Sequence, residues 1–499
     1  MAKVRIKDGN FFFVALVFVF LLFGFLTWSG QLPYGSDSDE HMLVAKTMLK
    51  TGQFSVGDIH GTKYPPVISA LLILFSLAGS DMGFCMILAN YFFLLCTGLL
   101  CFWFIGRQFD SRWLGAMAGI YVLSNIVLWQ SVRLIIADTL FVLLVTIVLM
   151  MSLQLQQWKR RHVLYALIVV LFATSVRSVG AVLSVPVITA IWGNRKWKLN
   201  PFSFVSATLF ICVPVVTLVL YTLYQKQFGA HPTGYLETFF LSDPYDISKG
   251  PLTWSGFLIR TYDHAFSSAT DISTAILSIL PTFGNIYIGA FYFISAAVIL
   301  AAACRRSGLQ AATVLSFMIP YSAIAVLWPY SGPRFAIPLI PVAAMGLAEI
   351  ASSISKRFAR AGRIGILILF LGYVGMNMIY MAGTAHLEKT KLAEIHRNDK
   401  DLTDWYLKHI PEDAVTASFD YREHTLRLNR SVLPLYYTSD MQAQVSYLTQ
   451  HKVSVLILSD AGYYLRGVYG RSLLKTLGNN AELLFKNELF EVYRLKGVF

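Results

Sequence analysis

The chain has 499 residues, of which 56% are hydrophobic and only 14% are charged, and its formal net charge is +13. A soluble chain carries roughly a quarter charged residues, so this composition excludes a soluble enzyme, a disordered chain and a disulfide scaffold. The lysines and arginines form small clusters between apolar runs, which is typical of a multi-pass membrane protein and not of a nucleic-acid-binding protein.

About eleven apolar segments are predicted to span the membrane, because each approaches or exceeds the length needed to cross about 30 Å of hydrocarbon. They cover residues 11–29, 84–105, 113–131, 134–153, 163–176, 178–193, 203–224, 283–303, 311–329, 335–352 and 364–382. The first segment follows basic residues, as the apolar part of a signal peptide does, but no small-residue cleavage site follows it. We therefore expect it to remain as an uncleaved first span.

The apolar run at residues 65–79 is ambiguous, because about 15 residues give only roughly 22 Å of helix. If it stays outside the bilayer and the N-terminus is cytoplasmic, every cluster of two or more basic residues between spans faces the cytoplasm. If it spans, the later clusters all face outward, against the positive-inside rule. We therefore expect an interfacial or half-buried helix on the outer face, with a short ordinary span as the alternative.

This topology predicts a membrane domain at residues 1–385, with large outer loops at 30–83 and 225–282, and an extracytoplasmic tail at 386–499. Short apolar strands alternate with helices along the tail, which predicts a small α/β domain. The expected elements are a helix at 399–409, a strand at 414–418, a helix at 421–428, a strand at 431–435, a helix at 440–451 capped by Ser439, a strand at 453–458, a helix at 462–477 and a hairpin at 481–495.

Three carboxylates stand close together in the first outer loop, and we call them the acid cluster: Asp37, Asp39 and Glu40. They precede a helix-like stretch at residues 42–50. Acids at a helix start interact favourably with the helix dipole, so helix capping alone would explain the cluster. A carboxylate near the membrane surface also suits a general base that takes a proton from a hydroxyl.

Four basic residues are expected at one depth on the outer face, and we call them the cationic set: Lys63, Arg133, Arg177 and Arg334. Several cations at one membrane level suit a phosphate carried on a lipid. Arg133 and Asp138 stand five residues apart and could pair with each other. A purely structural ion pair there, and a snorkelling anchor at Lys63, are the alternatives. Together with the acid cluster, the cationic set indicates group transfer from a lipid phosphate to an outer acceptor.

The order and spacing of these short motifs resemble the GT-C class of glycosyltransferases, in the branch of protein O-mannosyltransferases, lipid A aminoarabinose transferases and related bacterial enzymes. The matching motifs are Asp39-Glu40, Lys63-Tyr64-Pro65-Pro66, Arg133 with Asp138, Arg177, and Arg334-Phe335-Ala336-Ile337-Pro338. The resemblance covers residues 1 to about 380 and extends loosely into the tail. It departs where Tyr64 interrupts the Lys-Pro-Pro element of the family, and where Arg177 replaces a common lysine.

The resemblance implies an inverting transfer of a sugar from a dolichyl- or undecaprenyl-type phosphate to a protein, lipid or glycan hydroxyl, in a bacterial plasma membrane. Asp39 would act as the base and the cationic set would stabilise the departing phosphate, with Tyr64 and Asp138 in support. Asp37 or Glu40 would orient the acceptor or bind a divalent ion. Zinc binding is a further alternative for three histidines expected in outer loops: His60, His231 and His264.

Two non-enzymatic classes compete with this interpretation. A secondary transporter or flippase would place broken helices at the membrane midplane and often contains repeats, and the chain has no visible repeat. A non-catalytic envelope assembly protein would use the tail as a binding module, and the acid cluster would then be incidental. Neither class transfers or hydrolyses a polyprenyl-phosphate sugar.

Overall fold

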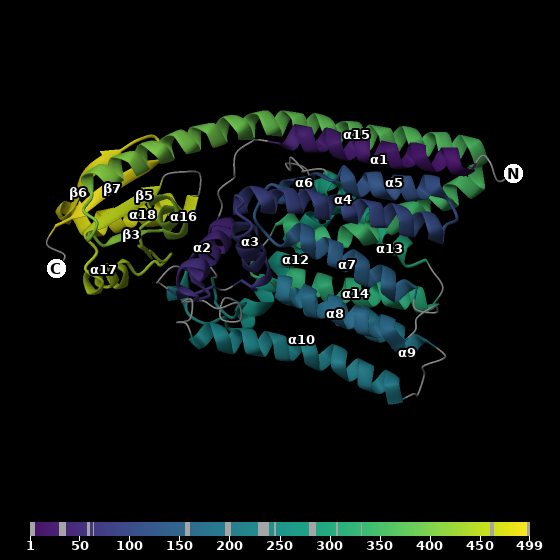
Figure 1. The fold of residues 1–499 in the computed structure, drawn as a ribbon, viewed down its shortest axis with the longest axis horizontal. Helices are drawn as coiled ribbons and strands as arrows, with labels where there is room; N and C mark the ends of the chain where they lie inside the picture. Colours follow the sequence, from purple (N-terminus) through teal and green to yellow (C-terminus); the bar gives the residue numbers. More distant parts are fainter. Residues whose placement is uncertain are drawn as a thin grey trace.

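The computed structural model describes residues 5–28, 36–56, 60–62, 64–154, 160–194, 201–227, 239–243, 246–278, 286–305, 308–330, 332–459 and 464–496. Long helices that lie alongside one another form a helical body, and a small sheet with short helices forms a C-terminal domain at one end of it (Figure 1). One helix, α15 (Ile340–His409), runs through both parts.

Most helices of the helical body follow the predicted spans closely, whereas α12 (Trp254–Leu277) lies within the segment 225–282, for which an outer loop and no long helix is predicted. The helices of the body are α1 (Arg5–Thr27), α4 (Met82–Gln108), α5 (Arg112–Leu123), α6 (Ile126–Val132), α7 (Asp138–Leu153), α8 (Arg160–Val176), η2 (Ser178–Leu183), α9 (Ser184–Gly193), α10 (Pro201–Gln227), α12 (Trp254–Leu277), α13 (Ile286–Ala303), α14 (Gly308–Leu327) and η4 (Pro333–Leu339). Among the described residues, five helices are long and apolar enough to cross a membrane, or six if the bent pair α5–α6 forms one span. Shorter apolar helices cover other predicted spans, so the number of eleven stays a prediction.

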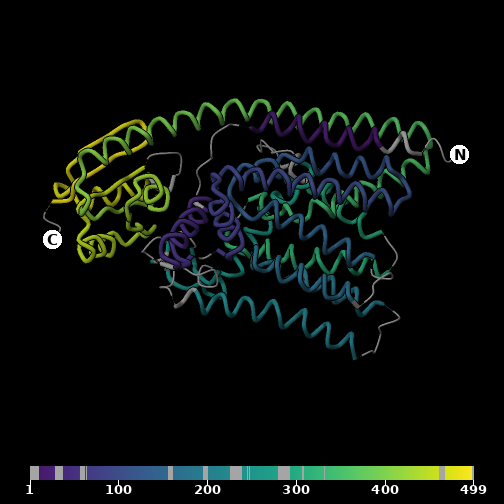
Figure 2. Tube along the Cα trace, viewed as in Figure 1, coloured from purple at the N-terminus to yellow at the C-terminus, as the bar shows by residue number. Residues whose placement is uncertain are grey.

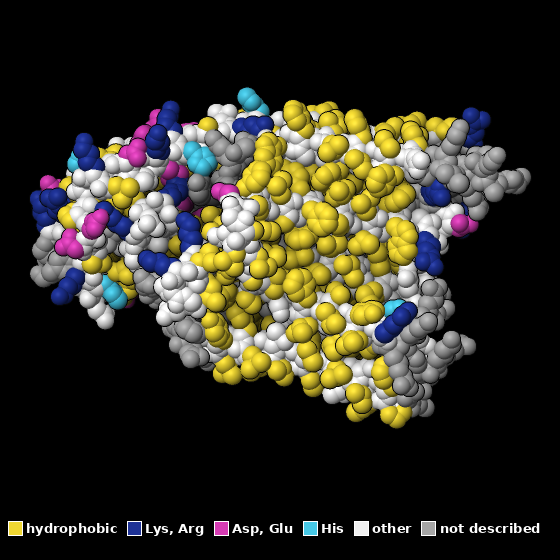
Figure 3. Space-filling model, viewed as in Figure 1, with side chains coloured by type: hydrophobic (Ala, Val, Ile, Leu, Met, Phe, Trp, Pro, Cys, Tyr) yellow, Lys and Arg dark blue, Asp and Glu magenta, His cyan; other side chains and the backbone are white. Residues whose placement is uncertain are grey.

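Apolar and charged side chains occupy different parts of the surface. Figure 3 shows hydrophobic side chains covering the helical body, while most charged side chains lie over the C-terminal domain and at the opposite end of the body. A continuous apolar surface around long helices is what the hydrocarbon of a bilayer covers. The chain is therefore an integral, multi-pass membrane protein.

The segment after the first span forms α2, a two-strand hairpin and α3. Their bounds are α2 (Ser36–Thr51), β1 (Ser55–Val56), β2 (His60–Gly61) and α3 (Val67–Leu77). The helix that was expected from residue 42 begins at Ser36, because Asp37 and Asp39 fit its first turn, where carboxylates interact favourably with the helix dipole. With 11 residues α3 is about 16 Å long, which is too short to cross a bilayer.

The two last predicted spans, 335–352 and 364–382, are parts of one chain segment. η4 leads into α15, which bends at Ala359, where φ is 45°. Beyond the bend, α15 lies beside α1 (Figure 2) and continues to His409, which ends it before Pro411 as predicted. No proline interrupts residues 360–409, so the last span and the first helix of the C-terminal domain are continuous.

The C-terminal domain contains a five-stranded sheet with the order β4-β3-β5-β7-β6. Strand β3 pairs in parallel with β4 and β5, and β7 pairs antiparallel with β5 and β6. The elements are β3 (Thr416–Ser418), α16 (Tyr421–Leu428), β4 (Val432–Pro434), α17 (Met441–Gln450), β5 (Val455–Ser459), α18 (Tyr464–Leu477), β6 (Ala481–Lys486) and β7 (Phe490–Leu495). This arrangement confirms the predicted small α/β fold.

The predicted cap of α17 is wrong by one residue. The side chain of Asp440, not that of Ser439, accepts a hydrogen bond from the backbone N–H of Ala443 at 2.9 Å. A carboxylate is a strong acceptor for the unpaired N–H groups of a first turn. Ser439 contacts a different part of the chain instead, because its backbone N–H donates to Asp246 in the second outer loop.

Candidate active site

Asp37 connects three segments that are far apart in the sequence. It lies in the first turn of α2. Its Oδ1 atom accepts a hydrogen bond from the Tyr64 hydroxyl at 2.5 Å, and its Oδ2 atom accepts one from Nη2 of Arg334 at 2.6 Å. Arg334 lies in η4, which leads into α15. This ion pair joins the acid cluster to the cationic set.

The other two acids are more deeply buried than Asp37, whose side chain is 19% exposed. Glu40 is fully buried and Asp39 is 2% exposed. Oγ1 of Thr62 donates a hydrogen bond to Oε1 of Glu40 at 2.6 Å, and Nη2 of Arg422 lies 2.8 Å from Oε2 of Glu40. Arg422 belongs to α16, so the C-terminal domain contacts the acid cluster directly.

His41 follows the acid cluster on α2 and is also buried. Its Nδ1 atom lies 3.3 Å from Oγ of Ser69, and its ring centroid lies 5.0 Å from that of Tyr64. Burial lowers the pKa of His41 to about 4, although the carboxylates of Glu40 and Asp37 act in the opposite direction. His41 is therefore uncharged at neutral pH and contributes no cation to the site.

Arg177 and Arg334 flank one aromatic ring. The guanidinium carbon of Arg334 lies 5.1 Å from the centroid of the Phe335 ring, and that of Arg177 lies 5.8 Å from the same centroid. Arg177 also forms an ion pair with Asp138, a buried carboxylate whose Oδ2 atom has no hydrogen-bond partner. Two members of the cationic set, Arg177 and Arg334, and both predicted supporting residues, Tyr64 and Asp138, are thus assembled around Asp37.

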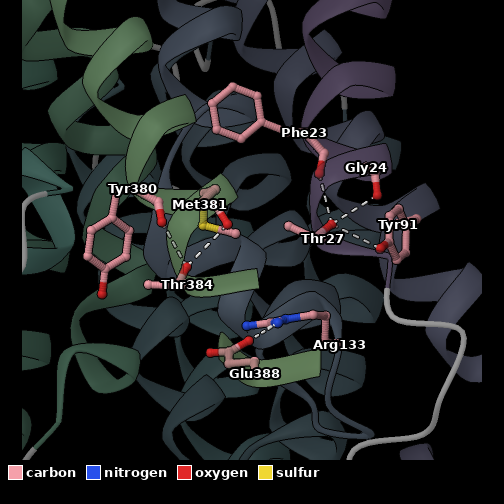
Figure 4. A network of polar contacts seen from close by, with 9 residues as sticks. All are labelled: Phe23, Gly24, Thr27, Tyr91, Arg133, Tyr380, Met381, Thr384 and Glu388. Atoms are coloured by element: carbon pink, nitrogen blue, oxygen red, sulfur yellow. Dashed lines mark hydrogen bonds and ion pairs between the residues drawn. The ribbon is translucent and has the colours of Figure 1, made fainter. Parts of the chain in front are cut away.

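The suggested pair between Arg133 and Asp138 is wrong. Arg133 forms an ion pair with Glu388 of α15 (Figure 4), while Asp138 pairs with Arg177. The cause is the turn between α6 and α7, in which the backbone N–H of Ile135 donates a hydrogen bond to Oγ of Ser38 at 3.1 Å. Arg133 ends α6 on one side of this turn and Asp138 begins α7 on the other, so each finds a partner elsewhere.

Some predicted residues fall outside the description. Lys63 and His231 lie outside the described residues, as does the side chain of His60. His264 lies on α12 and is partly buried. Within the described ranges, no group of three His, Cys, Asp or Glu side chains could hold a metal ion. The roles of Lys63 and of a divalent ion therefore stay predictions.

Sequence reasoning missed contacts that come from distant segments. Arg422 reaches the acid cluster from the C-terminal domain, and the hydroxyl of Tyr221 on α10 donates to the backbone carbonyl of Tyr64. Asp246 of the second outer loop accepts from Ser439. No spacing or motif identifies these residues, because their partners lie far away in the sequence.

No family model and no curated protein matches the sequence. Three solved structures resemble the whole chain. ArnT from Cupriavidus metallidurans in the apo state has a TM-score of 0.59 and 13% identity, over 98% of each chain. ArnT from the same organism bound to undecaprenyl phosphate has a TM-score of 0.56 and 13% identity, over 100% of this chain and 99% of that one.

The third structure is the arabinofuranosyltransferase AftD from Mycobacteria, with a TM-score of 0.54 and 12% identity. The match covers 98% of this chain and 42% of AftD. ArnT and AftD share the GT-C architecture, and identities this low compare folds alone. The chain therefore has the fold of the GT-C membrane glycosyltransferases.

Proposed function

We propose that the chain is an inverting glycosyltransferase that moves a sugar from a polyprenyl phosphate to a hydroxyl acceptor on the extracytoplasmic face of the membrane. The observation that carries this proposal is the contact of Asp37 with Arg334, beside Arg177, because it unites a carboxylate with two cations at one site. The similarity in fold to ArnT bound to undecaprenyl phosphate supports the class of donor. The proposed location is a bacterial plasma membrane.

In the proposed reaction the acceptor oxygen attacks C1 of the sugar from the face opposite the phosphate. The C1–O bond to the phosphate breaks, its electron pair leaves with the polyprenyl phosphate, and the acceptor proton passes to a carboxylate. We assign the carboxylate to Asp39. Asp39 begins the Asp-Glu pair on which the resemblance rests, and it lies in the first turn of α2, where the helix dipole favours the ionised form. Asp37 accepts hydrogen bonds from Tyr64 and Arg334, so it suits the positioning of Arg334.

The guanidinium groups of Arg177 and Arg334 would stabilise the charge that develops on the departing phosphate. Phe335 lies against both groups and limits their movement. Lys63 is proposed to assist them, since it directly precedes Tyr64. Arg133 is the least suited member of the cationic set for this role, because its ion pair is with Glu388 of α15, whereas Arg177 and Arg334 flank Phe335 next to Asp37.

The purified full-length protein in lipid nanodiscs, incubated with radiolabelled polyprenyl-phosphate sugars, tests the proposal. We expect release of polyprenyl phosphate together with free or transferred sugar, and retention of this activity in Arg397→Ala, which removes an exposed ion pair with Glu488 in the C-terminal domain. A transporter or flippase would move the labelled lipid without cleaving it. Intact donor in every reaction, across a panel of sugars, would contradict the proposed function.

A further inference from the structure

The acid-bearing helix α2 shares a hydrophobic core with the C-terminal domain. Leu43 and Val44 of α2 are buried in one cluster with side chains of α15, α16 and the sheet, including Leu402, Tyr421 and Val432. α2 therefore packs into the C-terminal domain as well as against α3 of the helical body. Its position depends on both parts of the protein.

A buried ion pair strengthens this packing at the acid cluster. Glu40 is fully buried, and the side chain of Arg422 is only 12% exposed. The guanidinium of Arg422 also lies 5.1 Å from the Tyr421 ring centroid, and its Nε donates to the Tyr421 hydroxyl at 3.0 Å. A fully buried carboxylate is costly without a cation, and Arg422 supplies that cation. Burial has the largest single effect and opposes the charge of Arg422, but Glu40, Tyr421, Tyr64 and Asp37 act together in the opposite direction, so the pKa of Arg422 is raised.

A second contact with an outer loop comes from the same edge of the sheet as Arg422. Arg422 follows the carboxyl end of β3, and Ser439 follows the carboxyl end of β4, which runs parallel to β3. Arg422 contacts Glu40, and Ser439 donates from its backbone to Asp246 while its hydroxyl lies 3.0 Å from that of Ser248. The carboxyl edge of the parallel strands is thus the face that contacts the first and second outer loops.

We infer that Arg422 is a positioning residue of the active site, which holds Glu40 and thereby fixes the orientation of α2, on which Asp37 meets Arg334 of the cationic set. The C-terminal domain is then a part of the catalytic unit and not a separate binding module. This inference rests on the proposed glycosyltransferase function. Arg422 contacts Glu40, and through Glu40 it acts on the orientation of α2.

Arg422 has two separable effects, one geometric and one electrostatic. A small displacement of reacting groups costs up to about 100-fold in rate, so loss of the geometric effect lowers kcat. Donor binding by Arg177 and Arg334 does not pass through Arg422, so the donor KM should change little. Without the cation, the neighbouring carboxylates of the acid cluster lose a favourable charge, so the acidic limb of the kcat profile, which reports the base, moves upward in pH.

Other groups near Glu40 limit how far the loss of the Arg422 charge shifts the pH profile. Asp37 and His41 lie on the same helix, Thr62 donates to the carboxylate, and Tyr421 lies beside Arg422. His41 stays neutral above about pH 4 and Thr62 carries no charge. Nη2 of Arg422 lies 2.8 Å from Oε2 of Glu40, and this is the charge that Arg422→Gln removes.

The test compares kcat, donor KM and pH profile in Arg422→Gln, Arg422→Lys and two controls in nanodiscs. Arg427→Gln removes a buried ion-pair partner of Asp399 within the C-terminal domain, and Arg397→Gln removes an exposed pair there. We expect Arg422→Gln to lower kcat by about 10- to 100-fold, with donor KM within about twofold and the acidic limb shifted upward. We expect Arg422→Lys to lower kcat by about 3- to 10-fold, because lysine lacks the planar geometry of the guanidinium. The acidic limb of its pH profile should stay at the wild-type pH, because the positive charge remains.

The outcomes distinguish the two proposals. Wild-type protein that leaves every donor intact contradicts the proposed function itself. Active wild-type protein with an unchanged kcat in Arg422→Gln, or with the same loss of kcat in Arg427→Gln, overturns the role of Arg422. If Arg422→Gln does not fold, Arg422→Lys decides: wild-type kcat in this variant overturns the positioning role, and a reduced kcat with an unchanged limb supports it.

Discussion

The assignment of the general base is tested by replacing Asp39 and Asp37 separately with asparagine. Asparagine keeps the size and the hydrogen-bonding oxygen of aspartate but cannot accept a proton at neutral pH. If Asp39 is the base, Asp39→Asn should lower kcat by about 10²- to 10⁴-fold, while the donor KM is retained. Asp39 lies in the first turn of α2, where the helix dipole favours the ionised form that a base requires.

The expected effect of Asp37→Asn is smaller and follows from its contacts. The main loss is the ion pair with Arg334, because asparagine still accepts from the Tyr64 hydroxyl. A charge-assisted hydrogen bond contributes about 1.5–3 kcal/mol, but Arg334 is 40% exposed and water screens the pair, so we expect about 1–2 kcal/mol. This corresponds to a loss of about 5- to 30-fold in kcat/KM.

Steady-state kinetics of both variants with one radiolabelled donor in nanodiscs provide the measurement. Asp243→Asn is a matched control, since Asp243 pairs with Lys249 in the second outer loop. Normal turnover in Asp39→Asn together with an inactive Asp37→Asn would move the base to Asp37. Normal turnover in both would refute the general-base account of this helix.

Four further expectations follow from the same structure. Arg334→Ala should lower kcat/KM for the donor by about 10- to 150-fold, from the loss of a contact of about 1.5–3 kcal/mol to phosphate; unchanged donor kinetics would remove Arg334 from the site. Arg177→Met leaves Asp138 buried without its cation, so the free energy of unfolding in mixed micelles should fall by about 3–5 kcal/mol. Adding Asp138→Asn to the same chain should restore most of the lost stability. The pKa of His41 falls from 6.5 to about 4 on folding, so the unfolded chain binds a proton at a higher pH than the folded chain does. The free energy of unfolding should therefore decrease by about 3 kcal/mol as the pH falls from 6.5 to 4. His41→Gln should remove this pH dependence. A reporter active only in the cytoplasm, fused after Phe499, should stay silent, and a strong signal would place the C-terminal domain inside.

Local patterns in the sequence determined most of the elements. The helix at Tyr421–Leu428 was predicted with the bounds that the structure has, and the end of α15 at His409 follows from Pro411. The apolar runs predicted the helices of the helical body, because hydrophobic length and helix breakers act within one segment. The sequence also predicted the acid cluster and its proximity to Arg334, since each belongs to a short motif in an outer connection.

The partners of charged residues were decided by the tertiary structure. Arg133 and Asp138 are close in sequence, yet one pairs with Glu388 and the other with Arg177. A turn can direct two neighbouring residues to opposite sides, and a charge in an apolar interior pairs with whichever countercharge the fold brings near. Sequence spacing alone contains no information about that choice.

The same reason explains why the sequence does not identify Arg422 as a residue of the site. It is one of several basic residues on a short amphipathic helix, and nothing in its surroundings distinguishes it from a solvated surface arginine. Only the packing of α2 into the C-terminal domain buries it against Glu40. The sequence by itself therefore determined the membrane class, the helices and the acid cluster, while the fold decided which distant cation neutralises each buried acid, because burial makes that pairing energetically necessary.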